Sequence, residues 1–479
     1  MPTHRLRQLL SDSFVYGLGG ILSKGITFLL VPIYTCILSP ADYGIMELMI
    51  TAVAILSSLT QGGMDSAQSY FFFKKEASSL DQKRLLISSI VKLRLLWTGV
   101  VLVLAAVPAV WLTHSLQGRT FNANFVLVAV AGILTTQMAD QATELFRLRF
   151  RPVPYVLVLA CQTALASGFA VLLMVHFQTG VIGYFWGILF GSTVAAVLSW
   201  SAHRQYWHLK TDPQEWTRPL IRFGIPLIPV SLGLLLVTTL DRWFLLRWAG
   251  PAEVGKYAVC AKVAALLTFI ATIFRQSWWP NAMQAIQQPD AAHLFRTIAR
   301  LYAYVSISLV LLLTAFAPVL IRVISPAPYW DAFPIIGVLA WQAVFFGFYL
   351  IASIGIWKSE KTHYTAWILA GSLCLNVLLL AWLVPAFGAL GAATATAIVF
   401  LVWNGLTVYV SERLWPVRYN FGELLGLLSY GVASTAITTV LYIQHFTLAG
   451  QGVAACSGLA LGCLAIYHTR AAVRNPFVF

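Results

Sequence analysis

The sequence predicts an all-α membrane protein with about fourteen transmembrane helices, and composition and hydropathy both point to this class. Of the 479 residues, 59% are hydrophobic and only 10% are charged, whereas soluble domains average about 25% charged residues. The mean hydropathy is +0.79. Apolar runs of roughly 20 residues or more, enough to cross a ~30 Å hydrocarbon core, recur along the whole chain. A soluble protein is therefore excluded.

The apolar runs define the individual helices. We expect a pseudo-symmetric arrangement of two six-helix lobes, residues 1–210 and 211–418, around a central cavity, with two additional helices in residues 419–479. The expected membrane-spanning helices cover residues 12–38, 44–72, 86–113, 122–147, 153–178, 181–203, 221–249, 254–281, 297–324, 332–357, 362–385, 389–413, 423–445 and 449–472.

Charged loops predict how these helices are oriented in the membrane. Most of the 31 Lys and Arg residues lie on one expected side, whereas the loops of the other side hold only Arg119, Arg247, Lys256 and Arg322. By the positive-inside rule, the basic side and both termini are cytoplasmic. The net charge of +14 thus reflects basic residues at helix ends, and we expect no nucleic-acid partner.

The helix expected over residues 44–72 carries a stripe of polar and small residues. Steps of four and three residues keep this stripe on one side of a helix. Because charges facing lipid cost at least ~2.5 kcal/mol each, the stripe must face protein or water. The preceding helix places Lys24 about 17 Å from its start, near mid-membrane. The stripe consists of Glu47, Thr51, Ala54, Ser58, Gln61 and Asp65.

A short repeat relates the two halves of the chain. Residues 40–44 read Pro-Ala-Asp-Tyr-Gly, and residues 251–255 read Pro-Ala-Glu-Val-Gly, an offset of 211 positions. Six helices separate the copies, so both have the same orientation, as in lobes related by an axis along the membrane normal. The offset maps Thr51 onto Lys262, about 12 Å below the start of its helix. Lys262 is therefore expected to face the cavity near mid-membrane.

Ionisable residues inside the expected helices are the candidate site residues, because charge within hydrocarbon is costly and rarely without function. We assign four cations to an anionic group on a substrate: Lys24, Lys262, Arg275 and Arg242. We assign five acids to gating or to binding of a coupling ion: Glu47, Asp65, Asp241, Asp140 and Glu144.

Structural interpretations of the same residues stay open at this stage. Lys24 could form a fixed salt bridge with Glu47, and Asp241-Arg242 could be an ion pair at the membrane interface. Four charged residues of the third and fourth helices could reach the headgroups or pair with one another: Lys92, Arg94, Asp140 and Glu144.

Signatures of enzymes and metal sites are missing from the sequence. It contains no GxxxxGK[ST] or HExxH pattern, and its six cysteines have no CxxC spacing. We therefore expect a transporter with no catalytic residues, no metal site and no cofactor other than a coupling ion, H⁺ or Na⁺. Aromatic and polar residues are the candidates for selecting a glycan, namely Gln342, Tyr349 and Asn376.

Several motifs resemble the bacterial polysaccharide flippases, which share a superfamily with lipid II flippases and multidrug extruders. The residues that carry the resemblance are Tyr16-x-x-Gly19, Lys24, Phe28-Leu29-Leu30-x-Pro32-x-Tyr34, Leu38-Ser39-Pro40-x-Asp42-Tyr43-Gly44, Glu47, Asp241-Arg242 and Gly255-x-Tyr257-x-x-Ala261. The resemblance implies an inner-membrane protein that moves an undecaprenyl-diphosphate-linked oligosaccharide to the periplasmic leaflet by alternating access. It also implies that Lys24 and Lys262 line the cavity, whereas Arg275 matches no position of the family pattern.

The chemistry of such a substrate fits the candidate residues. A diphosphate needs compensating cations within a wet cavity, and an inward-negative potential helps to expel an anion by about 2.3 kcal/mol per charge per 100 mV. A polysaccharide polymerase and chain-length machinery are the implied partners besides the bilayer. The alternatives are a multidrug or cation antiporter of the same superfamily, a membrane-embedded glycan polymerase or ligase, and a scaffold in an export complex.

Overall fold

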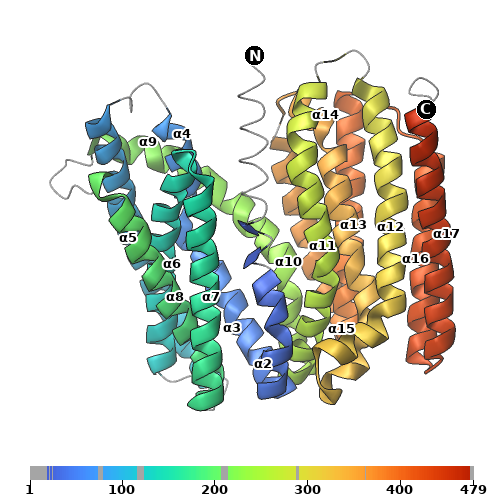
Figure 1. The fold of residues 1–479 in the computed structure, drawn as a ribbon, viewed down its shortest axis with the longest axis horizontal. Helices are drawn as coiled ribbons and strands as arrows, with labels where there is room; N and C mark the ends of the chain where they lie inside the picture. Colours follow the sequence, from blue (N-terminus) through green and yellow to red (C-terminus); the bar gives the residue numbers. More distant parts are fainter. Residues whose placement is uncertain are drawn as a thin grey trace. The chain divides into compact units, whose positions relative to one another are not determined.

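A computed structural model describes residues 19–20, 22–23, 25–73, 79–115, 123–206, 214–286, 288, 291–361 and 363–474. Throughout these ranges every regular element is a helix (Figure 1), so the all-α prediction is confirmed. Lys24 lies outside the described residues. Its predicted role and its predicted salt bridge with Glu47 therefore stay predictions.

The helices follow one another with short connections. Those of the first half are α2 (Val31–Ile37), α3 (Pro40–Gln61), α4 (Met64–Phe72), α5 (Leu80–Ser115), α6 (Ala123–Leu148), α7 (Pro152–His176), α8 (Val181–Ala202), η2 (Arg204–Tyr206), α9 (Gln214–Gly224), η3 (Ile225–Leu227) and α10 (Ile228–Ala249). Those of the second half are α11 (Pro251–Ala285), α12 (Ala291–Ile324), η4 (Ala327–Ile335), α13 (Ile336–Ala352), α14 (Ile354–Lys358), α15 (His363–Leu414), α16 (Phe421–Ile443) and α17 (Thr447–Arg474).

Twelve helical stretches of the described chain are long and apolar enough to cross a membrane. One of them, α15, has 52 residues and a non-helical conformation at Gly388 (φ 55°, ψ −129°), three residues after Pro385. At 1.5 Å per residue its length is about 78 Å, more than two crossings of a ~30 Å core. The kink therefore separates the two spans expected over residues 362–385 and 389–413. Gly25–Ile37 is a shorter apolar helix, and the prediction of about fourteen spans is confirmed.

Internal contacts divide the chain into two compact units. Unit 1 comprises Met1–Leu38 and Met46–Leu236, and unit 2 comprises Ser39–Ile45 and Val237–Phe479. Helices α3 and α10 each begin in one unit and end in the other. These units are defined by contacts, whereas the expected lobes are defined by the internal repeat. The expected limits of the lobes, at residues 210 and 418, therefore stay predictions.

In unit 2 the last two helices pack against α12 and α13 (Figure 1). Polar contacts join them at three levels: Ser308 Oγ donates to the Gly458 carbonyl (2.6 Å), Trp341 Nε1 donates to Thr435 Oγ1 (3.1 Å), and the Tyr442 hydroxyl donates to the Thr314 carbonyl (2.8 Å). Hydrogen bonds and small residues are what hold helices together where lipid supplies no hydrophobic drive. Helices α16 and α17 are therefore built into unit 2.

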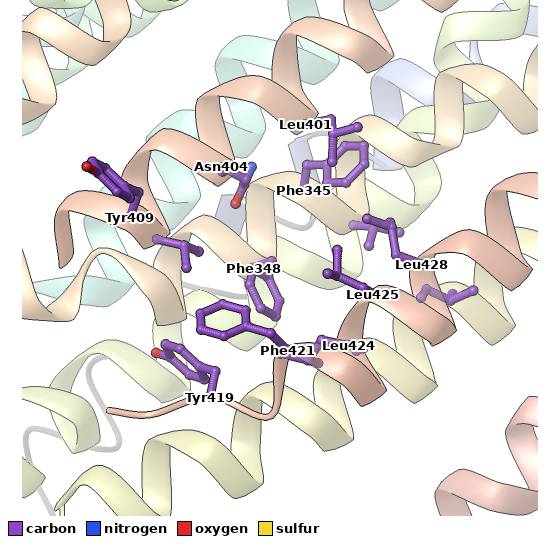
Figure 2. A pocket seen from close by; sticks show the side chains of 15 residues that line it. Phe345, Phe348, Leu401, Asn404, Tyr409, Tyr419, Phe421, Leu424, Leu425 and Leu428 are labelled. Atoms are coloured by element: carbon purple, nitrogen blue, oxygen red, sulfur yellow. The ribbon is translucent and has the colours of Figure 1, made fainter. Parts of the chain in front are cut away.

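An apolar cavity of about 340 Å³ lies between α12, α13, α15 and α16 (Figure 2). Phe345, Phe348, Leu425 and Leu428 line it, and Asn404 is one of its few polar groups. Such a lining suits hydrocarbon and cannot solvate charge. A site for a charged substrate group must therefore lie elsewhere.

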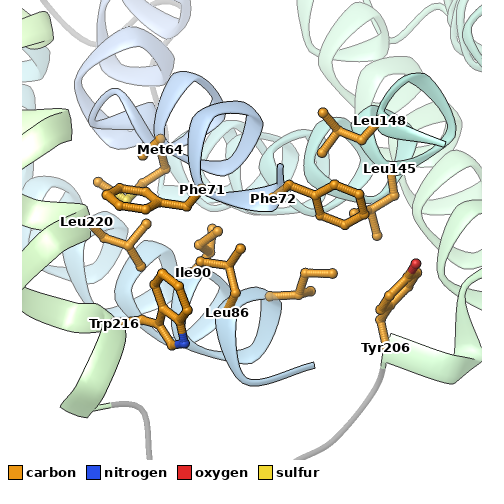
Figure 3. Packing of buried hydrophobic residues seen from close by; sticks show 12 residues of the cluster. Met64, Phe71, Phe72, Leu86, Ile90, Leu145, Leu148, Tyr206, Trp216 and Leu220 are labelled. Atoms are coloured by element: carbon orange, nitrogen blue, oxygen red, sulfur yellow. The ribbon is translucent and has the colours of Figure 1, made fainter. Parts of the chain in front are cut away.

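In unit 1 a cluster of buried aromatic and aliphatic residues joins α4, α5 and α9 (Figure 3). Phe71 packs edge-on against Trp216 with 5.7 Å between ring centroids, and Leu86, Ile90 and Leu220 fill the space beside them. Aromatic pairs of this geometry contribute about 0.5–1.5 kcal/mol beyond their buried area. The cluster fixes the amphipathic helix α9 and, with it, the start of α10.

The single helix expected over residues 44–72 is interrupted between α3 and α4. Gly62 and Gly63 have φ values of 57° and 68°, and a Cβ atom on Gly63 would lie 2.4 Å from the Gly224 carbonyl oxygen. This left-handed conformation is open to glycine at little cost. Because the helix is interrupted, Glu47 and Asp65 lie in different helices, α3 and α4. The prediction that both belong to one stripe on a single helix is therefore wrong.

We predict that Gly63→Ala destabilises the protein by about 1–3 kcal/mol, because the new methyl group meets both a strained backbone and a neighbouring carbonyl. Thermal unfolding of the detergent-purified protein measures the effect. Gly371→Ala is the matched control, since a Cβ atom there meets nothing within 4 Å and alanine favours helices. Equal melting temperatures for Gly63→Ala and the wild type would contradict this account.

Candidate functional site

Lys262 on α11 contacts Tyr43, which belongs to unit 2 although it opens α3. The Lys262 ammonium donates a hydrogen bond to the Tyr43 hydroxyl (2.8 Å) and lies 5.0 Å from the centroid of its ring. Tyr43 is fully buried, and Lys262 is half-buried. An ammonium over an aromatic face gains about 0.5–2 kcal/mol. The Tyr43 phenol is therefore one of the partners of the predicted substrate cation.

The repeated motif places Tyr43 beside Lys262. A Cβ atom on Gly44 would lie 1.9 Å from the Pro251 carbonyl oxygen, and one on Gly255 would lie 2.0 Å from the Pro40 carbonyl oxygen. The two copies of the motif thus pack against each other within unit 2, each glycine on the carbonyl of the other copy's proline. Only residues without a Cβ atom allow backbones to approach so closely.

Two further contacts fix the same region. The Tyr43 ring packs edge-on against Tyr329 of η4, with 6.1 Å between centroids. The Lys256 ammonium pairs with Glu253 (3.2 Å) and with Asp331 of η4. The first turns of helices α3 and α11 therefore pack together with η4 in one layer inside unit 2.

Asp241 and Arg242 on α10 lie at a second polar site of unit 2. The Tyr257 hydroxyl donates to Asp241 Oδ2, and Arg242 Nη1 contacts Asp241 Oδ1 (3.3 Å) and the Thr238 carbonyl (3.2 Å). Asp241 is only 4% exposed. The pair predicted from sequence forms and is buried in protein, and its depth in the membrane stays a prediction.

Buried oxygen atoms extend this second site. Asn376 on α15 donates to the Val237 carbonyl, one turn before Asp241, and its Oδ1 atom has no hydrogen-bond partner among the described residues. Thr396, also on α15, lies near the Tyr257 hydroxyl. Carboxylate, amide and hydroxyl oxygens are the ligands that hard cations prefer. Asp241 thus has the surroundings of a cation or proton acceptor.

In unit 1, Asp65 on α4 pairs with Arg94 on α5. The Arg94 guanidinium also donates to the Gln137 carbonyl (2.9 Å), and the Gln61 amide donates to Asp65. Arg94 is 0% exposed, whereas the Asp65 side chain is 28% exposed. Because Arg94 is inside the protein, the alternative in which it reaches the headgroups is wrong.

Glu144 and Asp140 follow each other by one turn on α6. Glu144 accepts hydrogen bonds from Ser69 (3.2 Å) and from Arg147 (2.9 Å), and it is buried. Asp140 is exposed at the surface of unit 1, within electrostatic reach of Asp65 and Arg94. Three of the four acids predicted for gating or coupling in unit 1, namely Asp65, Asp140 and Glu144, are therefore near one another.

The remaining candidates are dispersed. Glu47 is buried in unit 1, where its carbonyl accepts a hydrogen bond from the Thr51 hydroxyl (2.8 Å). Arg275 is exposed on α11. Of the glycan candidates, Tyr349 packs on Trp403 at 4.8 Å between centroids, and Gln342 is half-buried on α13.

Sequence reasoning missed Tyr43 and Tyr257 as site residues. A signal for Tyr43 was present in the repeat, because the second copy has Val254 at the equivalent position and so lacks the hydroxyl. Tyr257 lies two residues after Gly255 in the same motif. Neither position is ionised at neutral pH, so a search for intramembrane charge passes over both.

The twelve long apolar helical stretches of the described chain define a multi-pass membrane protein. The family model described as "polysaccharide biosynthesis protein" matches residues 9–286, more than half of the chain. The chain belongs to this family. No curated protein sequence matches it significantly.

Solved structures share the fold at low sequence identity. The lipid II flippase MurJ in an inward closed conformation superposes with a TM-score of 0.71 at 12% identity, covering 96% of this chain and 99% of MurJ. An inward-facing MATE multidrug resistance transporter of the MOP superfamily gives 0.64 at 12% identity, covering 82% and 95%. A MOP superfamily transporter from Pyrococcus furiosus, described as having a binding pocket of reverse polarity, gives 0.53 at 12% identity, covering 85% and 96%.

We predict that Asp65→Ala destabilises unit 1 by about 3–5 kcal/mol, because it leaves the Arg94 guanidinium buried without its carboxylate. Arg94→Met should cost less, since Asp65 keeps partial access to water, and the double variant should recover part of the loss. Thermal unfolding in detergent measures all three.

Asp81→Ala provides the matched control. The Asp81–Arg84 pair is exposed, with 83% of the Asp81 side chain accessible, so its loss should cost at most about 1 kcal/mol. Additive effects of the Asp65 and Arg94 substitutions would contradict the coupling described here.

Proposed function

We propose that the protein is a flippase that moves an undecaprenyl-diphosphate-linked oligosaccharide from the cytoplasmic to the periplasmic leaflet of a bacterial inner membrane. Membership of the polysaccharide biosynthesis family and the fold shared with a lipid II flippase support this proposal. The observation that carries it is the half-buried Lys262 ammonium on a membrane-spanning helix, in contact with a neutral phenol.

The proposal follows from the cost of moving a diphosphate through hydrocarbon. An unpaired anion in a medium of low dielectric constant costs tens of kcal/mol by Born solvation, so cations inside the protein must replace its water. Lysine suits transient binding because its ammonium is a point charge on a flexible stem, whereas arginine favours one fork-like geometry. Lys24 is the second cation in our proposal. Alternating access then exposes the neutralised headgroup to each leaflet in turn.

We further propose that a coupling ion, H⁺ or Na⁺, binds at Asp241. This carboxylate is buried, Tyr257 donates a hydrogen bond to it, and the Asn376 amide group donates to the Val237 carbonyl, one turn earlier on α10. A cation that binds Asp241 competes with Arg242 for the carboxylate, and this competition ties the conformation of unit 2 to an ion gradient. The acids of unit 1, Glu47, Asp65, Asp140 and Glu144, are the alternative location.

A multidrug or cation antiporter is the second candidate function, supported by the shared MATE fold. Such a protein needs a carboxylate-centred pocket for cationic drugs, whereas the candidate here is a lysine. A glycan polymerase or ligase and an export scaffold are the remaining alternative functions. As partners of a flippase we propose a separate polysaccharide polymerase and chain-length machinery. Transport of the lipid-linked oligosaccharide by the purified protein separates the flippase from all of these.

We predict that Lys262→Ala reduces flipping of a fluorescent undecaprenyl-diphosphate oligosaccharide in proteoliposomes at least tenfold, because the headgroup loses a compensating charge. Lys262→Arg should retain part of the activity, since the charge survives but the geometry changes. Lys24→Ala should resemble Lys262→Ala.

Lys256→Ala is the matched control for these variants. It removes an ammonium six residues earlier on the same helix, from an ion pair with Asp331, and should leave flipping within about twofold of the wild type. Normal flipping by both Lys24→Ala and Lys262→Ala would refute the proposed function.

We predict that Asp241→Asn abolishes the stimulation of flipping by an imposed ion gradient, because the amide cannot exchange a cation. Flipping measured separately under a Na⁺ gradient, a pH gradient and a membrane potential identifies the coupling ion. Asp331→Asn, on η4, is the matched control and should keep the stimulation. Gradient dependence that survives in Asp241→Asn would exclude this site and favour the acids of unit 1.

A further inference from the structure

The apolar cavity of unit 2 (Figure 2) is a groove that opens on the surface of the helices. Its floor is buried, with Phe345 6% and Asn404 4% exposed, whereas its rim is open, with Tyr409 53% and Leu425 57% exposed. The rim residues belong to α15 and α16, which are long and apolar enough to cross a membrane. Hydrocarbon chains of the bilayer therefore have access to this groove.

The groove follows these helices through most of one leaflet. It extends from Leu401 to Tyr409 on α15 and from Phe421 to Leu428 on α16. At 1.5 Å per residue these stretches are about 12 Å and about 10 Å long, whereas one half of a ~30 Å hydrocarbon core is about 15 Å thick. A single acyl chain that runs along the helices from the membrane surface matches this length.

The two ends of the groove differ in polarity (Figure 2). Tyr409 and Tyr419 lie at one end, whereas Leu401 and Leu428 lie at the other. Tyr419 belongs to the connection between α15 and α16, so the tyrosine end is at a membrane surface. The Tyr419 hydroxyl is buried and has no hydrogen-bond partner among the described residues. An ester or phosphate oxygen of a lipid can accept a hydrogen bond from it.

Basic side chains surround the tyrosine end. The exposed Arg413 guanidinium lies 4.3 Å from the centroid of the Tyr409 ring, and Arg296 donates to the Val417 carbonyl (2.9 Å), two residues before Tyr419. Four guanidinium groups and two carboxylates, which leave an excess of positive charge, lie at this end: Arg296, Arg300, Arg413, Arg418, Glu412 and Glu423. Basic pockets between membrane helices bind anionic lipid headgroups.

We propose that this groove is a binding site for an anionic phospholipid of the bilayer, with one acyl chain between α13, α15 and α16 and the phosphate beside Arg413 and Tyr419. The positive-inside rule places this end on the cytoplasmic side, where anionic lipids are attracted to basic groups near the surface. A phospholipid matches the groove better than the substrate of the proposed function, because an undecaprenyl chain is several times longer than the groove. The inference goes beyond the proposed function and does not depend on it.

Native mass spectrometry of the purified full-length protein tests this inference. The probes are phosphatidylglycerol, which is anionic, and phosphatidylcholine with the same acyl chains, which is zwitterionic. We expect the wild type to bind phosphatidylglycerol at least fivefold more tightly than phosphatidylcholine. Arg413→Gln should reduce this preference to less than twofold, because the headgroup loses a cation at the mouth of the groove. Arg322→Gln, the matched control, removes another exposed guanidinium, 5.5 Å from the Trp330 ring centroid, and should keep the preference.

A second substitution tests the position of the acyl chain. Gly405 lines the groove, and a Cβ atom there meets nothing within 4 Å. The ring of Gly405→Phe therefore has room to occupy the groove, and we expect it to weaken binding of phosphatidylglycerol at least fivefold. Gly371→Phe is the matched control, since Gly371 is exposed on the same helix outside the groove and a Cβ atom there also meets nothing within 4 Å. It should leave the affinity unchanged.

Three results would overturn the inference: equal affinities of the wild type for the two lipids, an undiminished preference in Arg413→Gln, or undiminished binding in Gly405→Phe. Undecaprenyl phosphate that displaces phosphatidylglycerol at an equal or lower concentration would also overturn it, and would assign the groove to an isoprenoid chain. None of these measurements involves flipping, so the proposed function stands or fails separately, on the Lys24 and Lys262 variants.

Discussion

The cost of charge in hydrocarbon is the constraint on which this structure depends. Each unit holds one ion pair whose charges are largely inside protein: Arg94 with Asp65 in unit 1, and Arg242 with Asp241 in unit 2. A charged side chain at the bilayer centre costs several kcal/mol unless it is paired or hydrated. Gln61 donates a further hydrogen bond to Asp65, and Tyr257 donates one to Asp241. Helix packing in both units is arranged around these polar contacts.

Features that depend on hydropathy alone were predictable from the sequence. The apolar runs gave the all-α class and the span count, and the kink of α15 falls at Pro385 to Gly388, where the sequence separated two spans. The interruption at Gly62 and Gly63 was missed, although two successive glycines are a turn signal, because the apolar run continues past them. Its cause is tertiary: the backbone of Gly224 lies against Gly63 and excludes a Cβ atom.

The candidate site was predictable only as far as ionised residues reveal it. Charge and the repeat singled out Lys262, and adjacency singled out Asp241 with Arg242. Neither pattern could predict which tyrosine hydroxyls contact these residues, since Tyr43 is 219 residues from Lys262 and Tyr257 is 16 residues from Asp241. Sequence also could not distinguish a buried pair from one at the headgroups, because that depends on which helices cover Arg94 and Asp241.

The Arg94 guanidinium and the Lys262 ammonium have different partners, which suits them to different roles. Removing the carboxylate from a buried arginine costs about 3–5 kcal/mol, so the Arg94–Asp65 pair is a permanent part of unit 1. A hydrogen bond between an ammonium and a phenol contributes about 1.5–3 kcal/mol, which an incoming phosphate oxygen exceeds because it carries charge. The contact with Tyr43 therefore helps to place the Lys262 ammonium. The proposed binding of an anion rests on this lysine over a tyrosine, which two glycines position by bringing the repeat copies together.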